Sequence, residues 1–152
     1  MKKILLMLTA AVMAFPVMAV NQHDSAGQVL LMPYYKVRDG QNTLLSVINT
    51  SGDTKAIKVR FMEAMNSREV LDFNMYMSPY DVWTAAIKPT KEGAMLVTND
   101  LTCTTPAIPK EGVEFRPYAY NGQLPDYPLD GGPTDLDRTR EGHIEVIEMG
   151  IA

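Results

Sequence analysis

The side chains with reactive chemistry are few and scattered along the sequence. The chain has a single cysteine, Cys103, and two histidines, His23 and His143. A nucleophilic hydrolase needs a thiol or hydroxyl beside an imidazole that an acid orients. No Gly-x-Ser-x-Gly motif is present to position a serine for this role. We therefore expect no catalytic residues, and an exported hydrolase remains an alternative that rests on residue presence alone.

Two other groups of side chains have the chemistry of metal ligands. Hard cations such as Ca²⁺ take several carboxylate oxygens from a flexible loop. A run of acidic residues near the end of the chain could supply them: Asp130, Asp135, Asp137 and Glu141. Their spacing differs from that of an EF-hand loop, and the neighbouring Arg138 and Arg140 favour a solvated acidic turn that is already neutralised.

Met75 and Met77 have the Met-x-Met spacing that holds Cu(I) in some exported proteins. Residues two apart on a strand lie on the same face, and here that face also carries Leu71 and Phe73. Methionine is an ordinary filler of a hydrophobic core. We therefore expect a core position for both sulfur atoms, and neither a metal nor another cofactor.

Aromatic side chains suggest a recognition surface in the second half of the chain. Tyr118, Tyr120 and Tyr127 lie among prolines, and amphipathic rings suit wet, flat binding faces. Such a face would fit a protein partner or, as an alternative function, a carbohydrate-binding module with exposed rings in a row. Trp83, in contrast, lies in a strand-like segment, and we expect it in the core.

The N-terminus has the features of a cleavable secretory signal peptide. Lys2 and Lys3 precede an apolar run that is too short to span a bilayer, and small residues follow it. We predict a signal peptide over residues 1–19, cleaved between Ala19 and Val20. The remaining residues 20–152 are expected to form one domain in the periplasm or at the cell surface, as a complete protein or the N-terminal part of a longer one.

Charge and cysteine content narrow the class of partner. The net charge is −4 and no basic cluster occurs, which argues against nucleic acid as a partner. A lone cysteine is unusual in a compartment where thiols pair. Cys103 is therefore an inert buried thiol, a bond to another chain, or one half of a disulfide whose partner lies beyond Ala152.

Short apolar runs separated by turn residues predict antiparallel β-structure for the first half of the chain. Alternation is clearest in residues 56–62, where Ile57, Val59 and Phe61 share one face and Lys58 and Arg60 the other. The expected strands are residues 28–37, 43–49, 56–62, 70–77, 82–87 and 95–98.

Three further features of this pattern are open to test. Asp39-Gly40 between the first two strands predicts a hairpin, and a short helix over residues 60–71 is an alternative to strands there. The second half is rich in proline, and in it only residues 113–120 and 142–149 look like strands. Residues 121–140 form a long connection of the kind that is often functional.

The runs Leu44-Leu45-Ser46-Val47-Ile48-Asn49-Thr50-Ser51, Ala56-Ile57-Lys58-Val59-Arg60-Phe61 and Val82-Trp83-Thr84 resemble the strands of immunoglobulin-like β-sandwich domains of bacterial surface proteins. The resemblance covers residues 28–87 and is one of pattern. The chain is also similar to uncharacterised secreted proteins that have Pro-Tyr-Tyr and Ser-Pro-Tyr-Asp-Val-Trp stretches. This likeness implies the fold and the compartment, although the cysteine pair of antibody domains is absent.

Taken together, these observations predict an exported, non-enzymatic module of the bacterial envelope or surface that builds or binds through protein–protein contacts. Its expected partner is another protein chain, and no membrane span is expected after signal cleavage. The last predicted strand, with Ile144 and Val146, is the segment that we expect to offer an open edge for strand pairing.

Overall fold

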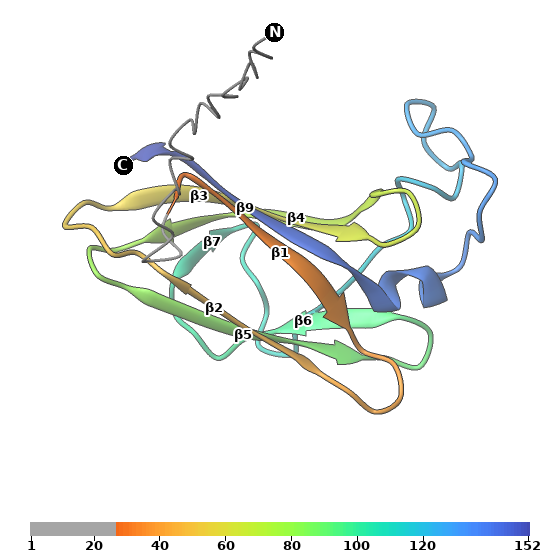
Figure 1. Cartoon of the computed structure of the whole chain (residues 1–152), viewed down its shortest axis with the longest axis horizontal. Helices are drawn as coiled ribbons and strands as arrows, with labels where there is room; N and C mark the ends of the chain where they lie inside the picture. Colours follow the sequence, from red (N-terminus) through yellow and green to blue (C-terminus); the bar gives the residue numbers. More distant parts are fainter. Residues whose placement is uncertain (1–26) are drawn as a thin grey trace, which may run out of the picture.

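Two antiparallel sheets packed face to face make up the described part of the chain, residues 27–152, in the computed structural model (Figure 1). One sheet has five strands in the order β1-β9-β3-β4-β7, and the other has four in the order β2-β5-β6-β8. This mainly β sandwich confirms the predicted fold class. The signal segment, the cleavage point between Ala19 and Val20, and His23 lie outside the described residues.

Most strands coincide with the alternating segments of the sequence, as their bounds show: β1 (Val29–Lys36), β2 (Thr43–Ile48), β3 (Lys55–Glu63), β4 (Glu69–Met77), β5 (Val82–Pro89), β6 (Ala94–Val97), β7 (Cys103–Thr105), β8 (Val113–Glu114) and β9 (Glu141–Ile151). A 3₁₀ helix, η1 (Leu136–Arg140), precedes β9. Two strands and a turn occupy residues 60–71, so the helical alternative there is wrong.

The predicted hairpin between the first two strands is wrong. β1 pairs with β9 and β2 pairs with β5, so the turn at Asp39-Gly40 carries the chain from one sheet to the other. Both turn residues have positive φ, 57° and 74°, as a tight reversal requires. Turn chemistry of this kind reverses the chain, but it does not decide which strands become neighbours.

The predicted strand over residues 113–120 is mostly loop, because the chain changes sheets within it. The Phe115 N–H donates to the Ala94 carbonyl at the end of β6, whereas the next N–H, of Arg116, donates to the Val70 carbonyl in β4. Regular pairing therefore stops after β8. The short strand β7 was not predicted, since its three residues are all polar or sulfur-bearing.

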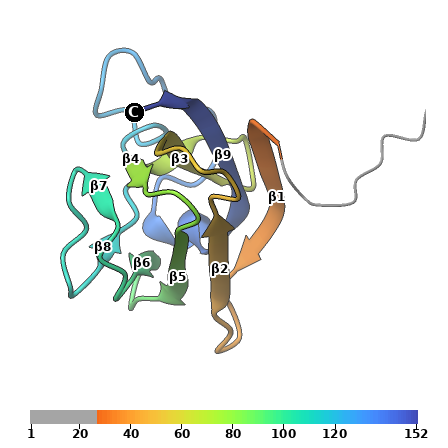
Figure 2. The ribbon, with the colours of Figure 1, turned by 90° about the vertical axis from the view of Figure 1, so that its left-hand side faces the viewer.

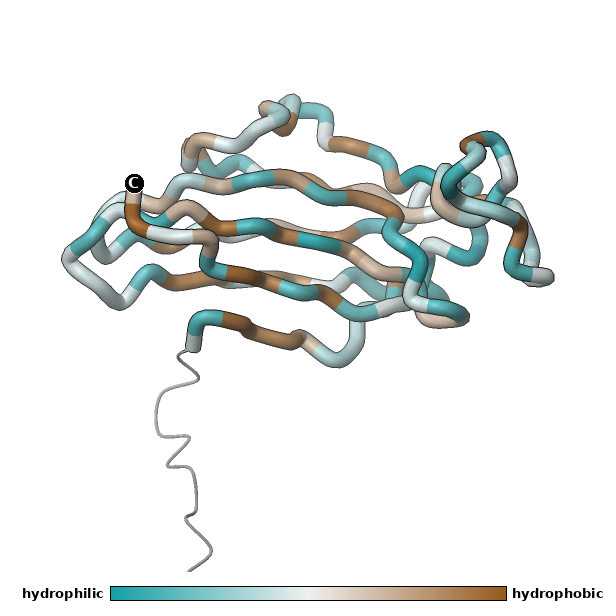
Figure 3. Tube along the Cα trace, turned by 90° about the horizontal axis from the view of Figure 1, so that it is seen from above, coloured by the Kyte–Doolittle hydropathy of each residue, from teal (hydrophilic) through white to brown (hydrophobic). Residues whose placement is uncertain are grey.

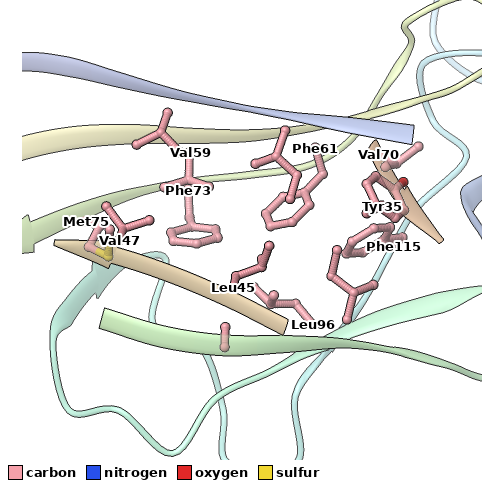
Figure 4. Close-up of a cluster of buried hydrophobic side chains, with 14 of the residues drawn as sticks. Tyr35, Leu45, Val47, Val59, Phe61, Val70, Phe73, Met75, Leu96 and Phe115 are labelled. Atoms are coloured by element: carbon pink, nitrogen blue, oxygen red, sulfur yellow. The ribbon is translucent and has the colours of Figure 1, made fainter. Parts of the chain in front are cut away.

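The core lies between the sheets and is rich in aromatic rings (Figure 4). Phe61 of β3 lies at its centre, with ring centroids 5.2 Å from Phe115, 6.3 Å from Tyr35 and 6.4 Å from Phe73. Trp83 is buried against Phe73, as expected. The side chains of Met75 and Met77 are fully buried, which confirms their predicted position in the core.

Gly142, near the start of β9, is needed because β3 approaches it closely. A Cβ at this position would overlap the Met62 carbonyl oxygen and lie 2.7 Å from Cε1 of Tyr35. We expect Gly142→Ala to lower the free energy of unfolding by about 1–3 kcal/mol, because backbone atoms cannot move aside without breaking the ladder. Urea denaturation would measure the loss.

Gly27→Ala provides the control for this substitution, since a Cβ there meets nothing closer than 3.4 Å. Equal denaturation midpoints for the two variants and the unmodified protein would show that the close approach of β3 and β9 is not a constraint on position 142.

Candidate functional site

Strand β9, which was predicted to offer an open edge for strand pairing, does not lie at the edge of its sheet. β9 lies inside the five-stranded sheet, where it pairs with β1 on one side and β3 on the other. Ile144 pairs with Met32 and Phe61, and Val146 pairs with Leu30 and Val59. Both side chains are buried. The prediction that Ile144 and Val146 offer an open edge is therefore wrong, because β1 returns to cover the outer side of β9.

The three tyrosines do not form a flat exposed face. Tyr120 is fully buried, and its hydroxyl donates to the Asp135 carbonyl at 3.0 Å. Tyr118 and Tyr127 are half-buried and meet edge to face, with ring planes 87° apart. The Tyr118 hydroxyl also donates to Glu69 at 2.6 Å. A sugar-binding platform needs exposed coplanar rings, so this group does not provide one.

The fold does not bring the Cys103 thiol close to the His143 imidazole. Cys103 is exposed on β7, so the alternative of an inert buried thiol is wrong. His143 lies on β9, and β3 and β4 separate the two strands. Three strand spacings amount to about 14 Å, well beyond proton-transfer distance. The disulfide alternatives for Cys103 stay predictions.

Three of the four acidic residues considered as calcium ligands, Asp130, Asp137 and Glu141, are paired with arginines. Arg138 binds Glu63 through Nε–Oε2 and Nη2–Oε1 contacts of 2.8 and 3.0 Å, and its Nη1 lies 2.9 Å from Oδ1 of Asp130. Arg38 pairs with Asp137 and Glu141. Within residues 27–152, no three His, Cys, Asp or Glu side chains gather as a metal ion would require.

Glu63, Arg138 and Asp130 form a buried cluster in which every charged group is hydrogen-bonded to a group of opposite charge. Burial raises the pKa of Glu63, but hydrogen bonds from Arg138 and from three backbone N–H groups outweigh it and lower the pKa below its ordinary value. Hydrogen bonds from Arg138 and Asn66 hold the pKa of Asp130 well below its usual range. The Arg138 guanidinium also lies 4.3 Å from the centre of the Tyr120 ring. These hydrogen bonds and ion pairs hold the loop before β9 in place, and they engage each charged group of the cluster.

The outer faces of the two sheets differ sharply in charge. On β3, β4 and β9 of the five-stranded sheet, polar and apolar residues alternate (Figure 3), whereas the edge strand β1 exposes the apolar Val29 and Leu31. Ion pairs join neighbouring strands of that sheet: Lys58 with Asp72, Arg60 with Glu69 and Glu145, and Lys55 with Glu148. This face is therefore self-complementary within one molecule and well solvated.

The outer face of the four-stranded sheet is uncharged where β2 and β5 meet. Its three cross-strand pairs are Leu44 with Ala86, Ser46 with Thr84, and Ile48 with Val82. Leu44 is 81% exposed, Ile48 57% and Val82 45%. Exposed aliphatic side chains therefore lie at both ends of this uncharged stretch, with Ser46 and Thr84 between them.

A shallow groove runs along part of this uncharged face. It encloses about 620 Å³, and Leu44, Thr84 and Ala86 line its floor together with Val97 of β6. Lys88, Lys110 and Glu111 also line it. An apolar floor with charged residues among its walls is the composition of a small protein-binding surface.

β2 is the open edge of this sheet, and it has none of the usual protective features of an edge strand. Edge strands are normally kept from pairing by proline, charge, a bulge or short length. β1 contains Pro33 and a register shift between Met32 and Tyr35, and β7 and β8 have three and two residues. β2 has six uncharged residues in unbroken register with β5.

Within residues 27–152, the backbone of β2 has hydrogen-bonding groups without a partner strand at this edge. The Asn49 N–H donates to the Asp81 carbonyl, which sets the phase of the β2–β5 ladder. Antiparallel ladders alternate between bonded and non-bonded pairs. The N–H and C=O groups of Leu44, Ser46 and Ile48 therefore point away from β5, toward the open side. These same residues have their side chains on the uncharged outer face.

One end of the edge is already occupied. The Thr43 hydroxyl donates to the Lys36 carbonyl at 2.9 Å and accepts from the Lys36 N–H at 3.1 Å, which ties β2 to the end of β1. β1 and β2 lie on the same side of the sandwich (Figure 2). The stretch open to another strand is thus residues 44–48.

The sequence contained a signal for this site that alternation alone did not single out. Residues 43–49 carry no charged side chain on either face, unlike the neighbouring segment 55–63. Within residues 27–152, no helix is long and apolar enough to cross a membrane. Comparisons of the chain with protein-family models, with curated proteins and with solved structures each found no match.

Proposed function

We propose that this chain is an exported, non-enzymatic recognition module of the immunoglobulin-like type, which binds another protein chain in the envelope or at the cell surface. Binding takes place by addition of an extended strand to the open edge of β2. The observation that carries the proposal is the unprotected edge over residues 44–48, beside an uncharged outer face. Export rests on the signal peptide predicted for residues 1–19.

Strand addition uses two sets of contacts, and β2 has both. Free backbone groups supply the main-chain hydrogen bonds that give affinity, and alternate side chains supply selectivity. An added strand places one row of side chains on the outer face, beside Leu44 and Ile48. Its other row covers the rim of the core beside Leu45 and Val47, which are buried in the described sandwich.

The test uses a photo-reactive amino acid at Val82, an exposed position opposite Ile48 on the neighbouring strand. Irradiation of host cells that produce this protein should give a discrete cross-linked adduct. Ser46→Pro should abolish the adduct, because proline removes an N–H that faces the partner and leaves the β2–β5 ladder intact. Mass spectrometry of the adduct identifies the bound chain.

Leu31→Pro is the matched control, since the ladder phase also turns the backbone of Leu31 toward an open edge, that of β1. It should leave the adduct unchanged. An adduct that survives Ser46→Pro, in a variant whose circular dichroism and melting are normal, would overturn strand addition at β2. Loss of the adduct in both variants would place the binding edge elsewhere.

A further inference from the structure

We infer that the strand added to β2 is β2 of a second copy of this chain, so that the two molecules form a two-fold symmetric dimer. This inference rests on the proposed function, because it names the occupant of the same edge. The observation that carries it is a self-complementary sequence centred on Ser46.

The chemical classes of residues 40–52 read almost the same in both directions. Ser46 is flanked by Leu45 and Val47, and these by Leu44 and Ile48. Thr43 and Asn49 follow, and the segment ends with Gly40 on one side and Gly52 on the other. An interface related by a two-fold axis requires that residue i meets j while j meets i. A strand that is a palindrome in residue class satisfies this condition.

The ladder phase allows a two-fold axis at Ser46, the position that the palindrome selects. Residues whose backbone faces the open side form the hydrogen-bonded pairs of the new ladder. Leu44 then lies opposite Ile48 of the second copy, and Ser46 lies opposite its own equivalent. Three such pairs provide about six backbone hydrogen bonds. Aliphatic and Ser–Ser pairs directly opposite one another are both favourable across antiparallel strands.

The paired stretch itself carries no charge. Residues 40–52 are uncharged, and Asp39 and Asp53 lie beyond both ends of the paired stretch. The union joins two four-stranded sheets into one sheet and brings Leu44 of each copy beside Ile48 of the other, with Val82 on the strand beyond it. The exposed aliphatic side chains of both outer faces thus merge into one cluster, which explains why these positions lack the ion pairs of the five-stranded sheet.

The first experiment measures the mass of the mature chain, beginning at Val20, by analytical ultracentrifugation over a wide range of concentration. We expect a reversible dimer. Ser46→Lys should give a monomer at every concentration, because two lysines would meet at the two-fold axis. Leu31→Lys, a charge on the open β1 edge, should leave the dimer unchanged. Circular dichroism shows whether each variant is folded.

The second experiment tests the register, in a Cys103→Ser background that removes the exposed native thiol. Ser46→Cys should form a disulfide-linked dimer on mild oxidation, because paired Cα atoms at the axis lie about 5.5 Å apart. Leu44→Cys should not link to itself, because the two copies of residue 44 are about 13 Å apart along the strand.

A mature chain that stays monomeric, or a dimer that Ser46→Lys leaves intact, would overturn the inference. Equal disulfide formation by both cysteine variants would also overturn the stated pairing. Failure here is distinguishable from failure of the proposed function. A monomeric chain whose photo-adduct contains a different protein, and loses it in Ser46→Pro, retains strand addition at β2 and excludes the second copy as its occupant.

Discussion

Glu63→Ala is expected to lower the free energy of unfolding by about 3–5 kcal/mol, because it leaves the Arg138 guanidinium buried without one of its two carboxylate partners. The side chains of Arg138 and Glu63 are 2% and 0% exposed. Glu63 also accepts hydrogen bonds from the N–H groups of Met65, Asn66 and Arg68, so the same change leaves the β3–β4 turn without its acceptor. Denaturant titration followed by tryptophan fluorescence of Trp83 measures the loss.

A triple variant separates the missing partner from the missing volume. Glu63→Met, Arg138→Met and Asp130→Asn together remove all three charges of the cluster and keep much of the apolar volume, so this variant should be more stable than Glu63→Ala. Arg60→Ala serves as a surface control, because its ion pairs with Glu69 and Glu145 are partly solvated and exposed pairs contribute about 0–1 kcal/mol. A loss for Glu63→Ala no larger than for Arg60→Ala would show that the buried cluster does not stabilise the fold.

Phe61→Ala is expected to cost about 3–5 kcal/mol in the free energy of unfolding, through lost burial and the cavity left behind. The Phe61 ring contacts three other aromatic rings contributed by β1, β4 and the crossover after β8. These segments come from both sheets and cannot all move inward, so the cavity cannot collapse. The measurement is the shift of the denaturation midpoint at an unchanged m-value.

Leu101→Ala is the control for Phe61→Ala, because Leu101 is 93% exposed and its loss should change stability by less than about 0.5 kcal/mol. A Phe61→Ala variant as stable as Leu101→Ala would mean that the aromatic cluster does not form the centre of the core.

The unprotected edge of β2 also bears on how the chain behaves before the proposed strand addition takes place. A flat, uncharged edge strand pairs readily with any exposed strand, including those of partly folded chains. The other three sheet edges of the molecule are protected. β7 and β8 are short, and β1 contains Pro33 and a register shift. This contrast within one molecule supports the proposed strand addition at β2.

Local patterns in the sequence determined which residues face the core. Side chains alternate along a strand with a period of two, so Ile57, Val59 and Phe61 could be assigned to the buried face before any contact was known. The same rule placed Met75 and Met77 correctly inside the sandwich.

Tertiary structure alone decided which strands are neighbours, and with them the site. Alternation says which way a side chain points, but not what lies beside the strand. The sequence therefore supported Ile144 and Val146 as an edge and a β1–β2 hairpin, whereas pairing of β1 with β9 overturned both. The pairing of Glu63 with Arg138 joins residues 75 positions apart, and no local pattern encodes it. The open edge of β2 exists because its turn crosses between sheets, which is a property of the whole fold.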